Sequence, residues 1–241
     1  MYRQLSAVYD ELMSNVPYDK WVNYVQACCR RFQVTGKKML DLGCGTGTLT
    51  TLLDKHFEMT GVDLSANMLT IARDKLPHVP FFQENMIELD LNDQFDIIVT
   101  FCDSLNYVTD ESDVMTTFER VSDHLVNGGL FLFDVHSLYT IQSVYKDATF
   151  AYDSEQVAYI WNCFVEEDDR VEHDLTLFVK QHDEYYKRYD EWHIQKTFPI
   201  DKYKQMLSQT GFTILNVSAD FEWQAPKKTS ERIFFATKKG F

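Results

Sequence analysis

The chain has 241 residues, of which 45% are hydrophobic and 25% are charged. This length suits one large α/β domain, or one domain with an inserted subdomain, and the composition is that of a globular protein rather than a disordered one. No apolar run approaches membrane-spanning length, and residues 1–6 lack the basic region and apolar stretch of a signal peptide. We therefore expect a cytoplasmic protein with no membrane partner, present as a monomer or a homodimer.

The formal net charge is −14, from 37 acidic and 23 basic side chains. The average field of such a protein repels a phosphate backbone, and two short basic clusters, Arg30-Arg31 and Lys227-Lys228, are far apart in the sequence. A nucleic-acid partner is therefore disfavoured. The five cysteines are odd in number and show no Cys-x-x-Cys spacing, which predicts reduced core residues rather than a disulfide framework or a zinc site.

Strands and helices alternate over the first 135 residues. The spacing of Trp21, Tyr24 and Cys28 predicts a helix over 18–32. Strands are then predicted at 38–42, up to Asp63, near 79–84, at 95–101 and at 130–135, with helices at 47–54, 65–75 and 111–125 and a break at Gly128-Gly129. Continuous apolar strands that alternate with helices predict an α/β fold with a Rossmann-like, doubly wound, mostly parallel sheet.

The pattern changes after residue 148. Residues 149–196 are rich in Tyr, Trp, Phe and Val and are interrupted by acidic turns, which is typical of antiparallel strands and hairpins. A helix at 200–210 and strands at 212–218 and 232–237 follow. We therefore expect a core of residues 1–148 and 197–241, and an inserted antiparallel β layer, 149–196, that lies over the carboxyl edge of the main sheet and covers the active site.

The segment Asp41-Leu42-Gly43-Cys44-Gly45-Thr46-Gly47 lies directly between a predicted strand and a predicted helix. Glycine is needed there if the backbone turns with positive φ and a ligand touches the main chain. Asp63 ends the next strand, where its two carboxylate oxygens can accept hydrogen bonds from both hydroxyls of a ribose. These features predict an adenosine-containing ligand. Asp41 opens the motif at a place where a ligand amino group could use it directly or through water.

The glycine spacing discriminates among cofactors that contain adenosine. Dinucleotide folds use Gly-x-Gly-x-x-Gly, whereas these glycines fall at 43, 45 and 47 and position 48 is Thr. The spacing therefore disfavours NAD. A P-loop is excluded because no Gly-Lys-Ser/Thr follows.

Residues 39–50, with the run from Gly61 to Leu69, resemble the first motif and the following acidic loop of class I S-adenosylmethionine-dependent methyltransferases. The resemblance extends over Gln83-Glu84-Asn85-Met86, 95–108 and 124–130. Tyr9-Asp10-Glu11-Leu12-Met13, with Pro17-Tyr18 and Trp21, resembles a bacterial, small-molecule-type branch of that family. The resemblance implies S-adenosyl-L-methionine as the cofactor and S-adenosyl-L-homocysteine as the product.

The resemblance also implies roles for single residues toward the cofactor. Gly43 and Gly45 would line its methionine and ribose portions, and Asp63 would hold the ribose hydroxyls. Phe101 to Asp103, at the end of the fourth strand, would face the methionine amino group and the sulfonium.

The adenine would lie between Leu64 and Met86, and Asn85 would read its edge. Asn85 departs from the family pattern, because many members carry Asp at this position. Four residues are candidates for contact with the methyl acceptor: Tyr9, Trp21, Asn106 and Tyr107.

Methyl transfer from a sulfonium is an in-line displacement, so the protein must mainly hold the acceptor lone pair about 3 Å from the methyl carbon. A protonated amine or a hydroxyl also needs a base. Asp103 and His136 follow two adjacent strands and should border the reactive end of the cofactor. Strand alternation places Glu191 and His193 on one face and Trp192 on the other. The candidate catalytic residues are therefore Asp103, His136, Glu191 and His193.

The other histidines show no metal-ligand spacing, so no metal is expected and most of these side chains are predicted to lie on the surface. They are His56, His78, His124, His173 and His182. Two classes of function stay open. In the first, the acceptor is a small molecule held under the aromatic-rich layer. In the second, the chain acts on tRNA or another macromolecule, or binds the cofactor without turnover. The net acidity favours the small molecule, and a basic, aromatic-lined groove would indicate the nucleic acid.

Overall fold

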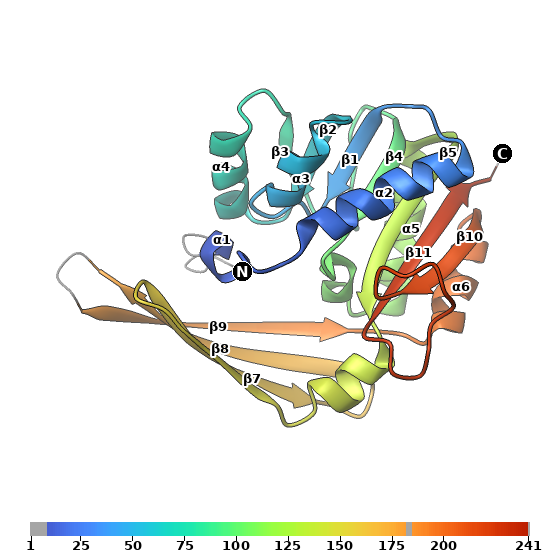
Figure 1. The fold of residues 1–241 in the computed structure, drawn as a ribbon. Coiled ribbons are helices and arrows are strands. Elements are labelled where there is room, and N and C mark those ends of the chain that lie inside the picture. The colour runs from blue at the N-terminus through green and yellow to red at the C-terminus, as the bar shows by residue number, and fades with distance from the viewer. Residues whose placement is uncertain (1–8, 182–184, 241) are drawn as a thin grey trace.

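The computed structural model describes residues 9–181 and 185–240, which form two β-sheets and the helices around them (Figure 1). One sheet has the strand order β10-β11-β5-β4-β1-β2-β3, and the other has the order β6-β7-β8-β9. The first sheet contains β1 (Lys38–Leu42), β2 (Glu58–Asp63), β3 (Phe81–Gln83), β4 (Phe95–Thr100), β5 (Leu125–His136), β10 (Phe212–Ala219) and β11 (Arg232–Lys239). The second contains β6 (Thr149–Asp153), β7 (Val157–Val165), β8 (Arg170–Lys180) and β9 (Tyr186–Lys196).

The first sheet, called the main sheet below, is mostly parallel. The strands β1 to β5 pair in parallel, whereas β11 is antiparallel to both β5 and β10. The predicted doubly wound α/β sheet is therefore confirmed. One boundary prediction was wrong, because β5 begins at Leu125 and not at residue 130. The chain passes Gly128 at φ +78°, and the ladder with β4 continues across the predicted break with a shift in register.

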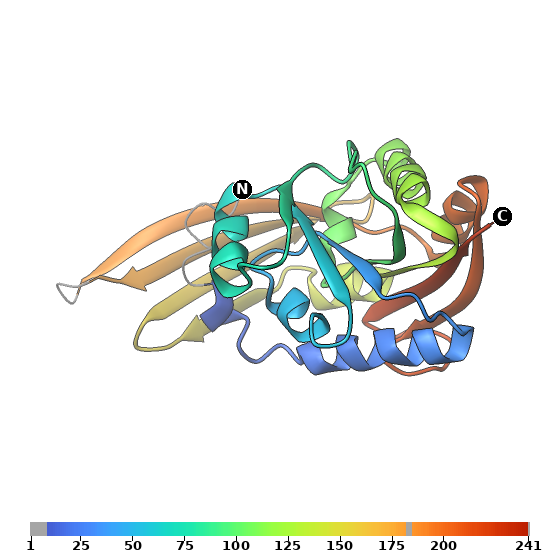
Figure 2. The ribbon, with the colours of Figure 1, turned by 90° about the horizontal axis from the view of Figure 1, so that it is seen from above.

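Helices cover both faces of the main sheet, as the view from above shows (Figure 2). The helices are α1 (Tyr9–Leu12), α2 (Tyr18–Phe32), α3 (Thr48–Leu53), α4 (Ala66–Lys75), α5 (Glu111–His124) and α6 (Ile200–Gln209), with short turns η2 (Ser104–Tyr107) and η3 (Thr140–Val144). One hydrophobic cluster joins α2, α3 and α4 to one face, and a second joins α5 and α6 to the other. The sheet is thus buried on both faces, which explains its continuous apolar strands. Among the described residues, no helix is both long and apolar enough to cross a membrane.

Helix α2 has the bounds that its pattern predicts. Trp21, Tyr24, Val25 and Cys28 recur at helical spacing, and all four are buried against the sheet. The helix ends where Gln33 takes a left-handed conformation. Burial of one face of an amphipathic helix, rather than its intrinsic propensity, supplies most of its stability.

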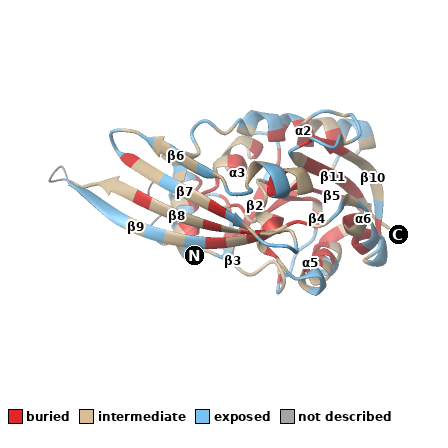
Figure 3. Ribbon diagram, turned by 90° about the horizontal axis from the view of Figure 1, so that it is seen from below, coloured by how far each residue is buried: buried red, intermediate tan, exposed pale blue. Residues whose placement is uncertain are grey.

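The four-stranded sheet extends away from the main sheet at the end where β1 and β4 finish (Figure 1). The side chains of its strands alternate between an inner and an outer face. In β9, His193 is buried and the Glu191 side chain is only 8% exposed, whereas Trp192 is 55% exposed. The predicted one-sided placement of Glu191 and His193 is therefore confirmed. Burial is concentrated in the main sheet and at the near end of the second sheet (Figure 3).

Candidate active site

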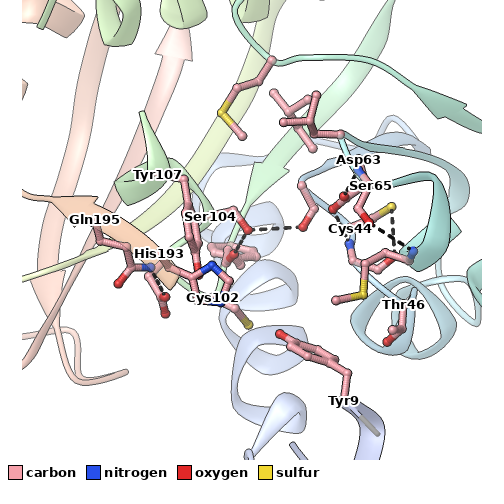
Figure 4. Close-up of a pocket in the computed structure, with 18 of the residues that line it drawn as sticks. Tyr9, Cys44, Thr46, Asp63, Ser65, Cys102, Ser104, Tyr107, His193 and Gln195 are labelled. Atoms are coloured by element: carbon pink, nitrogen blue, oxygen red, sulfur yellow. Dashed lines mark hydrogen bonds between the residues drawn. The ribbon is translucent and has the colours of Figure 1, made fainter. Parts of the chain in front are cut away.

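A cavity of about 690 Å³ lies between the carboxyl ends of the main-sheet strands and the inner face of the four-stranded sheet. The main sheet contributes Gly43 and Gly45 after β1, Asp63 at the end of β2, and Asp103 after β4. The second sheet contributes residues from β7, β8 and β9. They are Tyr159, Trp161, His173, Leu175, His193 and Gln195. In Figure 4, His193 and Gln195 lie on one side and Asp63 and Ser65 on the other, with the Tyr9 side chain between them.

The glycine loop after β1 leaves room for a ligand. Gly43 and Gly45 have φ values of +85° and +56°, which L-residues with a side chain rarely adopt. A Cβ at Gly43 would lie 2.8 Å from the Cβ of Ser104, so this glycine is needed for the close approach of the loop to η2. A Cβ at Gly45 would meet nothing within 4 Å, because Gly45 faces open space beside the cavity.

Asp63 is held rigidly beside this loop. Its Oδ1 accepts a hydrogen bond from the Ser65 amide at 2.8 Å, and its Oδ2 accepts one from the Gly45 amide at 2.8 Å. Burial raises the pKa of this carboxyl, against the lowering effect of the two amides. Each carboxylate oxygen retains a second lone pair, so both remain able to accept a hydroxyl. The fixed carboxylate fits a ribose diol.

Asp41 lies deeper, at the end of β1, and lines the same cavity. The hydroxyl of Thr50 donates to its Oδ2 at 2.6 Å. Burial, together with a smaller effect of nearby Asp63, raises the pKa of Asp41 to about 6, against the lowering effect of this hydrogen bond. A ligand ammonium bound beside Asp41 would favour its ionised form, because a nearby positive charge lowers the pKa of a carboxyl.

An apolar wall continues from Asp63. Leu64 is 57% exposed and lines the cavity together with Met86 and Asn85. The Asn85 Oδ1 accepts a hydrogen bond from the Ile87 amide at 3.2 Å, which fixes the orientation of its amide group. A large exposed side chain at the mouth of a cavity indicates contact with a ligand more than with the core.

The backbone is strained where β4 ends. Cys102 and Asp103 have consecutive left-handed φ values of 54° and 56°, a conformation that costs free energy in residues other than glycine. The turn aims the Asp103 carboxylate toward the cavity, where three side chains converge on it. Burial would raise the pKa of Asp103, but His136 and Arg232 beside it bring that pKa well below its usual range. Asp103, whose side chain is 21% exposed, is therefore a partly buried carboxylate that stays ionised.

Arg232, at the start of β11, pairs with two carboxylates, those of Asp103 and Asp134. Its Nη2 lies 2.9 Å from the Asp103 Oδ1, and its Nη1 donates to the Asp134 Oδ2. The Trp21 indole supports the pair, because its Nε1 donates to the Asp134 Oδ1 at 3.4 Å and its ring lies under the guanidinium. Trp21 is 3% exposed and is not among the lining residues. Its predicted contact with the acceptor is thus replaced by a supporting role in the core.

A directed chain of hydrogen bonds links Asp103 to the four-stranded sheet. The Gln195 Nε2 donates to the Asp103 Oδ2 at 2.9 Å. On its other side, the Gln195 Oε1 lies 3.1 Å from the His173 Nε2. The chain ends at Trp161, whose Nε1 donates to the His173 Nδ1 at 3.0 Å. A carboxylate can only accept, so the Gln195 amide oxygen must face His173, and the His173 Nε2 must carry the proton. Burial lowers the pKa of His173 to about 4. His173 is therefore a neutral imidazole.

His136, the last residue of β5, also lies beside Asp103. Its Nε2 lies 3.4 Å from the Asp103 Oδ2 and 3.4 Å from the Tyr145 hydroxyl. Asn106 fixes the backbone here, because its Oδ1 accepts from the His136 amide at 3.0 Å and its Nδ2 donates to the Lys196 carbonyl at 2.7 Å. Asn106 is fully buried and is not among the lining residues, so it joins η2 to β5 and β9 instead of facing an acceptor.

Of the other residues predicted to contact the acceptor, Tyr9 and Tyr107 do line the cavity. His193 lines it as well, with its ring centroid 6.2 Å from that of Tyr107. Glu191 does not line it, and its Oε2 lies 3.8 Å from the His193 Nε2. The structure therefore brings Asp103, His136 and His193 to one cavity and places Glu191 behind His193.

Sequence reasoning missed several of these residues. Arg232, Gln195 and Trp161 lie in strands and Tyr145 directly follows η3, all in segments with no local motif, so only the tertiary structure reveals them. The surface prediction for the remaining histidines was wrong for His173 and His124, which are 4% and 5% exposed. His56 and His78 are exposed, and His182 lies outside the described residues. Alternation in a two-residue period would have placed His173 on the inner face with Leu175.

The short helix α1 closes the cavity from the amino-terminal side. The Asp10 Oδ1 accepts hydrogen bonds from the hydroxyls of Thr46 at 2.7 Å and Thr48 at 3.1 Å, and its Oδ2 lies 2.6 Å from the Lys75 Nζ. The Glu11 Oε1 accepts from the Ser154 hydroxyl at 2.9 Å. Helix α1 thus joins the glycine loop to the four-stranded sheet. No group of His, Cys, Asp and Glu side chains that could hold a metal ion lies within 9–181 and 185–240.

Known proteins are similar to this chain in sequence and in fold. The model of a methyltransferase domain family matches residues 39–129. A protein of Geobacillus sp. (strain WCH70) that carries the name of a methyltransferase is 46% identical over 99% of both chains, and YqeM of Bacillus subtilis (strain 168) is 42% identical over 99% of this chain and 97% of its own.

The crystal structure of an S-adenosylmethionine-dependent methyltransferase from Clostridium acetobutylicum ATCC 824 is 32% identical. It covers this chain completely, 99% of its own length is matched, and the TM-score is 0.90. The predicted cofactor is S-adenosylmethionine, and the glycine loop, the fixed Asp63 and the strand order all fit it. The chain belongs to the class I S-adenosylmethionine-dependent methyltransferases.

Proposed function

We propose that the enzyme methylates a small molecule that is held between the main sheet and the four-stranded sheet. The observation that carries this proposal is that the two sheets line one shared cavity. Asp63 and Gly45 lie on one side of it, and Trp161 and His193 lie on the other. A volume of about 690 Å³ is in the range of small-molecule sites.

The half of the cavity nearest β1, β2 and β3 is proposed to hold the cofactor. Asp63 accepts the two ribose hydroxyls, and the open space at Gly45 admits the ribose and methionine portions beside Gly43. Asp41 faces the methionine ammonium.

The adenine packs against Leu64 and Met86, and the Asn85 amide reads its edge. Phe101 and Asp103, which also line the cavity, are proposed to face the sulfonium. These roles rest on the positions of the side chains in the cavity and on the family to which the chain belongs.

The cofactor supplies the activated methyl group, so the protein has little covalent chemistry to perform. We propose that Tyr9, Tyr107 and His193 orient the acceptor. Asp103 and His136 are proposed to stabilise its charge and to assist the transfer of its proton. Oriented binding of this kind can supply roughly 7–11 kcal/mol of the barrier reduction. Glu191 is proposed to orient His193 rather than to touch the acceptor.

We further propose that the four-stranded sheet, 149–196, is a subdomain that determines the acceptor, while 1–148 and 197–241 form the cofactor-binding core. Every residue that β7, β8 and β9 contribute to the cavity lies on the inner face of that sheet. The five cysteines, all free thiols in the structure, are compatible with the reducing cytoplasm as the location.

The names of relatives suggest the range of acceptors. An N,N-dimethyltransferase of a nucleotide-linked amino sugar from Streptomyces venezuelae is 32% identical over 38% of this chain. A malonyl-[acyl-carrier protein] O-methyltransferase of Bacillus cytotoxicus is 24% identical over 54% of it. Nitrogen and oxygen acceptors both occur among these relatives, so their names leave the methylated atom open.

A tRNA acceptor is not favoured. Among the described lining residues, Arg232 is the single Lys or Arg, and two carboxylates already pair with it. Asp41, Asp63, Glu84 and Asp113 also line the cavity, so its field opposes a phosphate backbone.

The proposed function is tested in two steps. In a thermal-shift assay, S-adenosylmethionine and S-adenosylhomocysteine should raise the melting temperature and NAD should not, because the glycine spacing suits only the former pair. Methyl-labelled cofactor is then offered with a bacterial small-molecule extract or with bulk tRNA. Label in the small-molecule fraction supports the proposal, and label that moves to tRNA contradicts it.

A further inference from the structure

The charges around Asp103 are unequal. Asp103, Asp134 and Arg232 together carry one net negative charge, because two carboxylates share one guanidinium. The His136 Nε2, 3.4 Å from the Asp103 Oδ2, is a neighbouring group that can take up a proton. The Asp134 side chain is fully buried, and the Asp103 and Arg232 side chains are each 21% exposed. The cluster is therefore poorly screened by water, and its charge acts strongly on a ligand at the sulfonium end of the cavity.

The neighbouring imidazole of His173 does not offset this charge. The Gln195 amide can donate to Asp103 in one orientation only, and that orientation requires the His173 Nε2 to donate a proton to the Gln195 oxygen. The His173 Nδ1 accepts from the Trp161 indole, so it has no place for a second proton. His173 is fixed as a neutral group.

The walls at this end of the cavity are aromatic. The Tyr145 ring lies edge-on to the rings of His136 and His173, with centroid distances of 5.3 Å in both cases, and 5.6 Å from that of Trp161. Aromatic rings around a carboxylate favour a cation, because their faces carry partial negative charge.

Nitrogen and oxygen acceptors have opposite charge requirements at this end of the cavity, which is called the compartment below. A neutral amine that takes a methyl group from a sulfonium becomes a cationic ammonium, so a positive charge remains in the compartment throughout the reaction. An alcohol, phenol or carboxylic acid reacts as an anion or as a group that loses its proton. A net negative compartment stabilises the first course and destabilises the second.

We propose that the acceptor is a small primary or secondary amine, with no anionic group near the reacting nitrogen, which binds beside Asp103 and His136. This inference rests on the proposed function and adds its substrate class. An amine that binds as its ammonium ion first gives up one proton, to the His136 Nε2 or to solvent. The freed nitrogen lone pair then forms the new N–C bond, and the electron pair of the broken C–S bond stays on sulfur. The product ammonium is paired with Asp103, and it can pass its proton to the His136 Nε2 or to solvent.

Sinefungin tests the charge preference without a known acceptor. It is a cofactor analogue that carries an ammonium-bearing carbon in place of the methyl sulfonium, whereas S-adenosylhomocysteine carries a neutral sulfur there. Dissociation constants of both are measured by calorimetry at neutral pH. We expect the wild-type enzyme to bind sinefungin about tenfold more tightly than S-adenosylhomocysteine, as suits an ammonium beside a partly buried carboxylate.

The Asp103→Asn variant should reduce this preference to less than about threefold. The matched control is Asp174→Asn, which removes a carboxylate next to His173 in β8 but on the outer face of the same sheet, and it should keep the wild-type ratio. The wild-type ratio itself needs no variant, so the test stands if Asp103→Asn fails to fold. A wild-type enzyme with no preference for sinefungin overturns the proposal.

A panel of matched acceptors tests the chemistry. Amines, alcohols and carboxylic acids that share one carbon skeleton are incubated with S-adenosylmethionine, and S-adenosylhomocysteine formation is measured. Methylation of amines and not of their oxygen counterparts supports the proposal, and equal or faster methylation of oxygen overturns it. If no compound reacts, the sinefungin ratio decides. Failure to bind S-adenosylhomocysteine at all contradicts the proposed function instead, so the two failures are distinguishable.

Discussion

Asp63 owes its position to two backbone amides, Gly45 and Ser65, which fix both carboxylate oxygens before any ligand arrives. We predict that Asp63→Ala weakens S-adenosylhomocysteine binding by about 1.5–3 kcal/mol, the scale of hydrogen bonds to a charged group. Calorimetric titration measures the loss. Asp74→Ala, an exposed position on α4, is the control and should bind normally. Unchanged affinity in Asp63→Ala would show that the ribose is held elsewhere.

The raised pKa of Asp41 predicts that cofactor binding depends on pH. Its pKa is raised to about 6, so the carboxyl is largely protonated at pH 5 and ionised at pH 7. The methionine ammonium favours the ionised form, so S-adenosylmethionine should bind more tightly as the pH rises through about 6 and reach a plateau above 7. Titrations at several pH values measure this slope. Asp41→Asn should remove it, and the same slope in that variant would assign the titration to another group.

At the scale of elements, helix α1 joins two parts of the molecule by contacts that Asp10 and Glu11 make. Asp10 carries three of these contacts, to Thr46, Thr48 and Lys75, yet its side chain is 42% exposed. Contacts of that exposure contribute little to global stability. They do join the helix to the glycine loop beside the proposed cofactor site, so their loss should act on ligand release more than on folding.

We predict that Asp10→Ala accelerates the dissociation of S-adenosylhomocysteine by about three- to tenfold, the effect of losing roughly 1 kcal/mol of loop contacts. The melting temperature without ligand should change little. Stopped-flow displacement measures the rate. Asp19→Ala on α2, which removes an exposed carboxylate elsewhere, should leave the rate unchanged. An unaltered rate in Asp10→Ala would mean that α1 does not limit release.

The four-stranded sheet is the second element with its own prediction. We expect His193→Ala to reduce turnover with the acceptor that the screen identifies, while cofactor affinity stays within about 0.5 kcal/mol, because the proposed cofactor residues lie on the main sheet. Glu191→Ala should act in the same direction but more weakly, since Glu191 lies behind His193. A tenfold loss of cofactor affinity in both variants would contradict the proposed division between core and inserted sheet.

Stability is a property of the whole molecule, and His173 makes it depend on pH. The folded-state pKa of His173 is lowered to about 4, against an ordinary value of 6.5, so the unfolded chain binds this proton more readily. Stability from this group is complete above pH 6.5 and is lost as the pH falls toward 4. Asp41 acts in the opposite direction, because its raised pKa favours the folded state as the pH falls.

The contribution of His173 is isolated by comparison with His173→Gln, in which Asp41 is unchanged. Between pH 7.5 and pH 5, the wild-type free energy of unfolding should fall by roughly 2 kcal/mol relative to that of the variant. Urea unfolding at both pH values measures the difference. A parallel change in the two proteins would show that His173 takes up its proton in the folded state.

Local signals in the sequence determined the elements and the cofactor half of the site. The helix over 18–32 follows from apolar spacing, and the placement of Gly43, Gly45 and Asp63 follows from strand ends that meet at one edge of a parallel sheet. These inferences need only the period of a helix or strand and the geometry of a tight turn. They concern neighbours along the chain or adjacent strands, so a single sequence contains the information.

The tertiary structure alone decided the acceptor half. Arg232 and Asp103 are 129 positions apart, and Gln195 reaches Asp103 across 92 positions, so no local pattern links them. The register of β8 and β9 brings His173 and Gln195 into the cavity, and the packing of α2 turns Trp21 toward Arg232 instead of the acceptor. The proposed amine acceptor is inferred from charges that only these long-range contacts place together, because electrostatic interaction depends on distance in space.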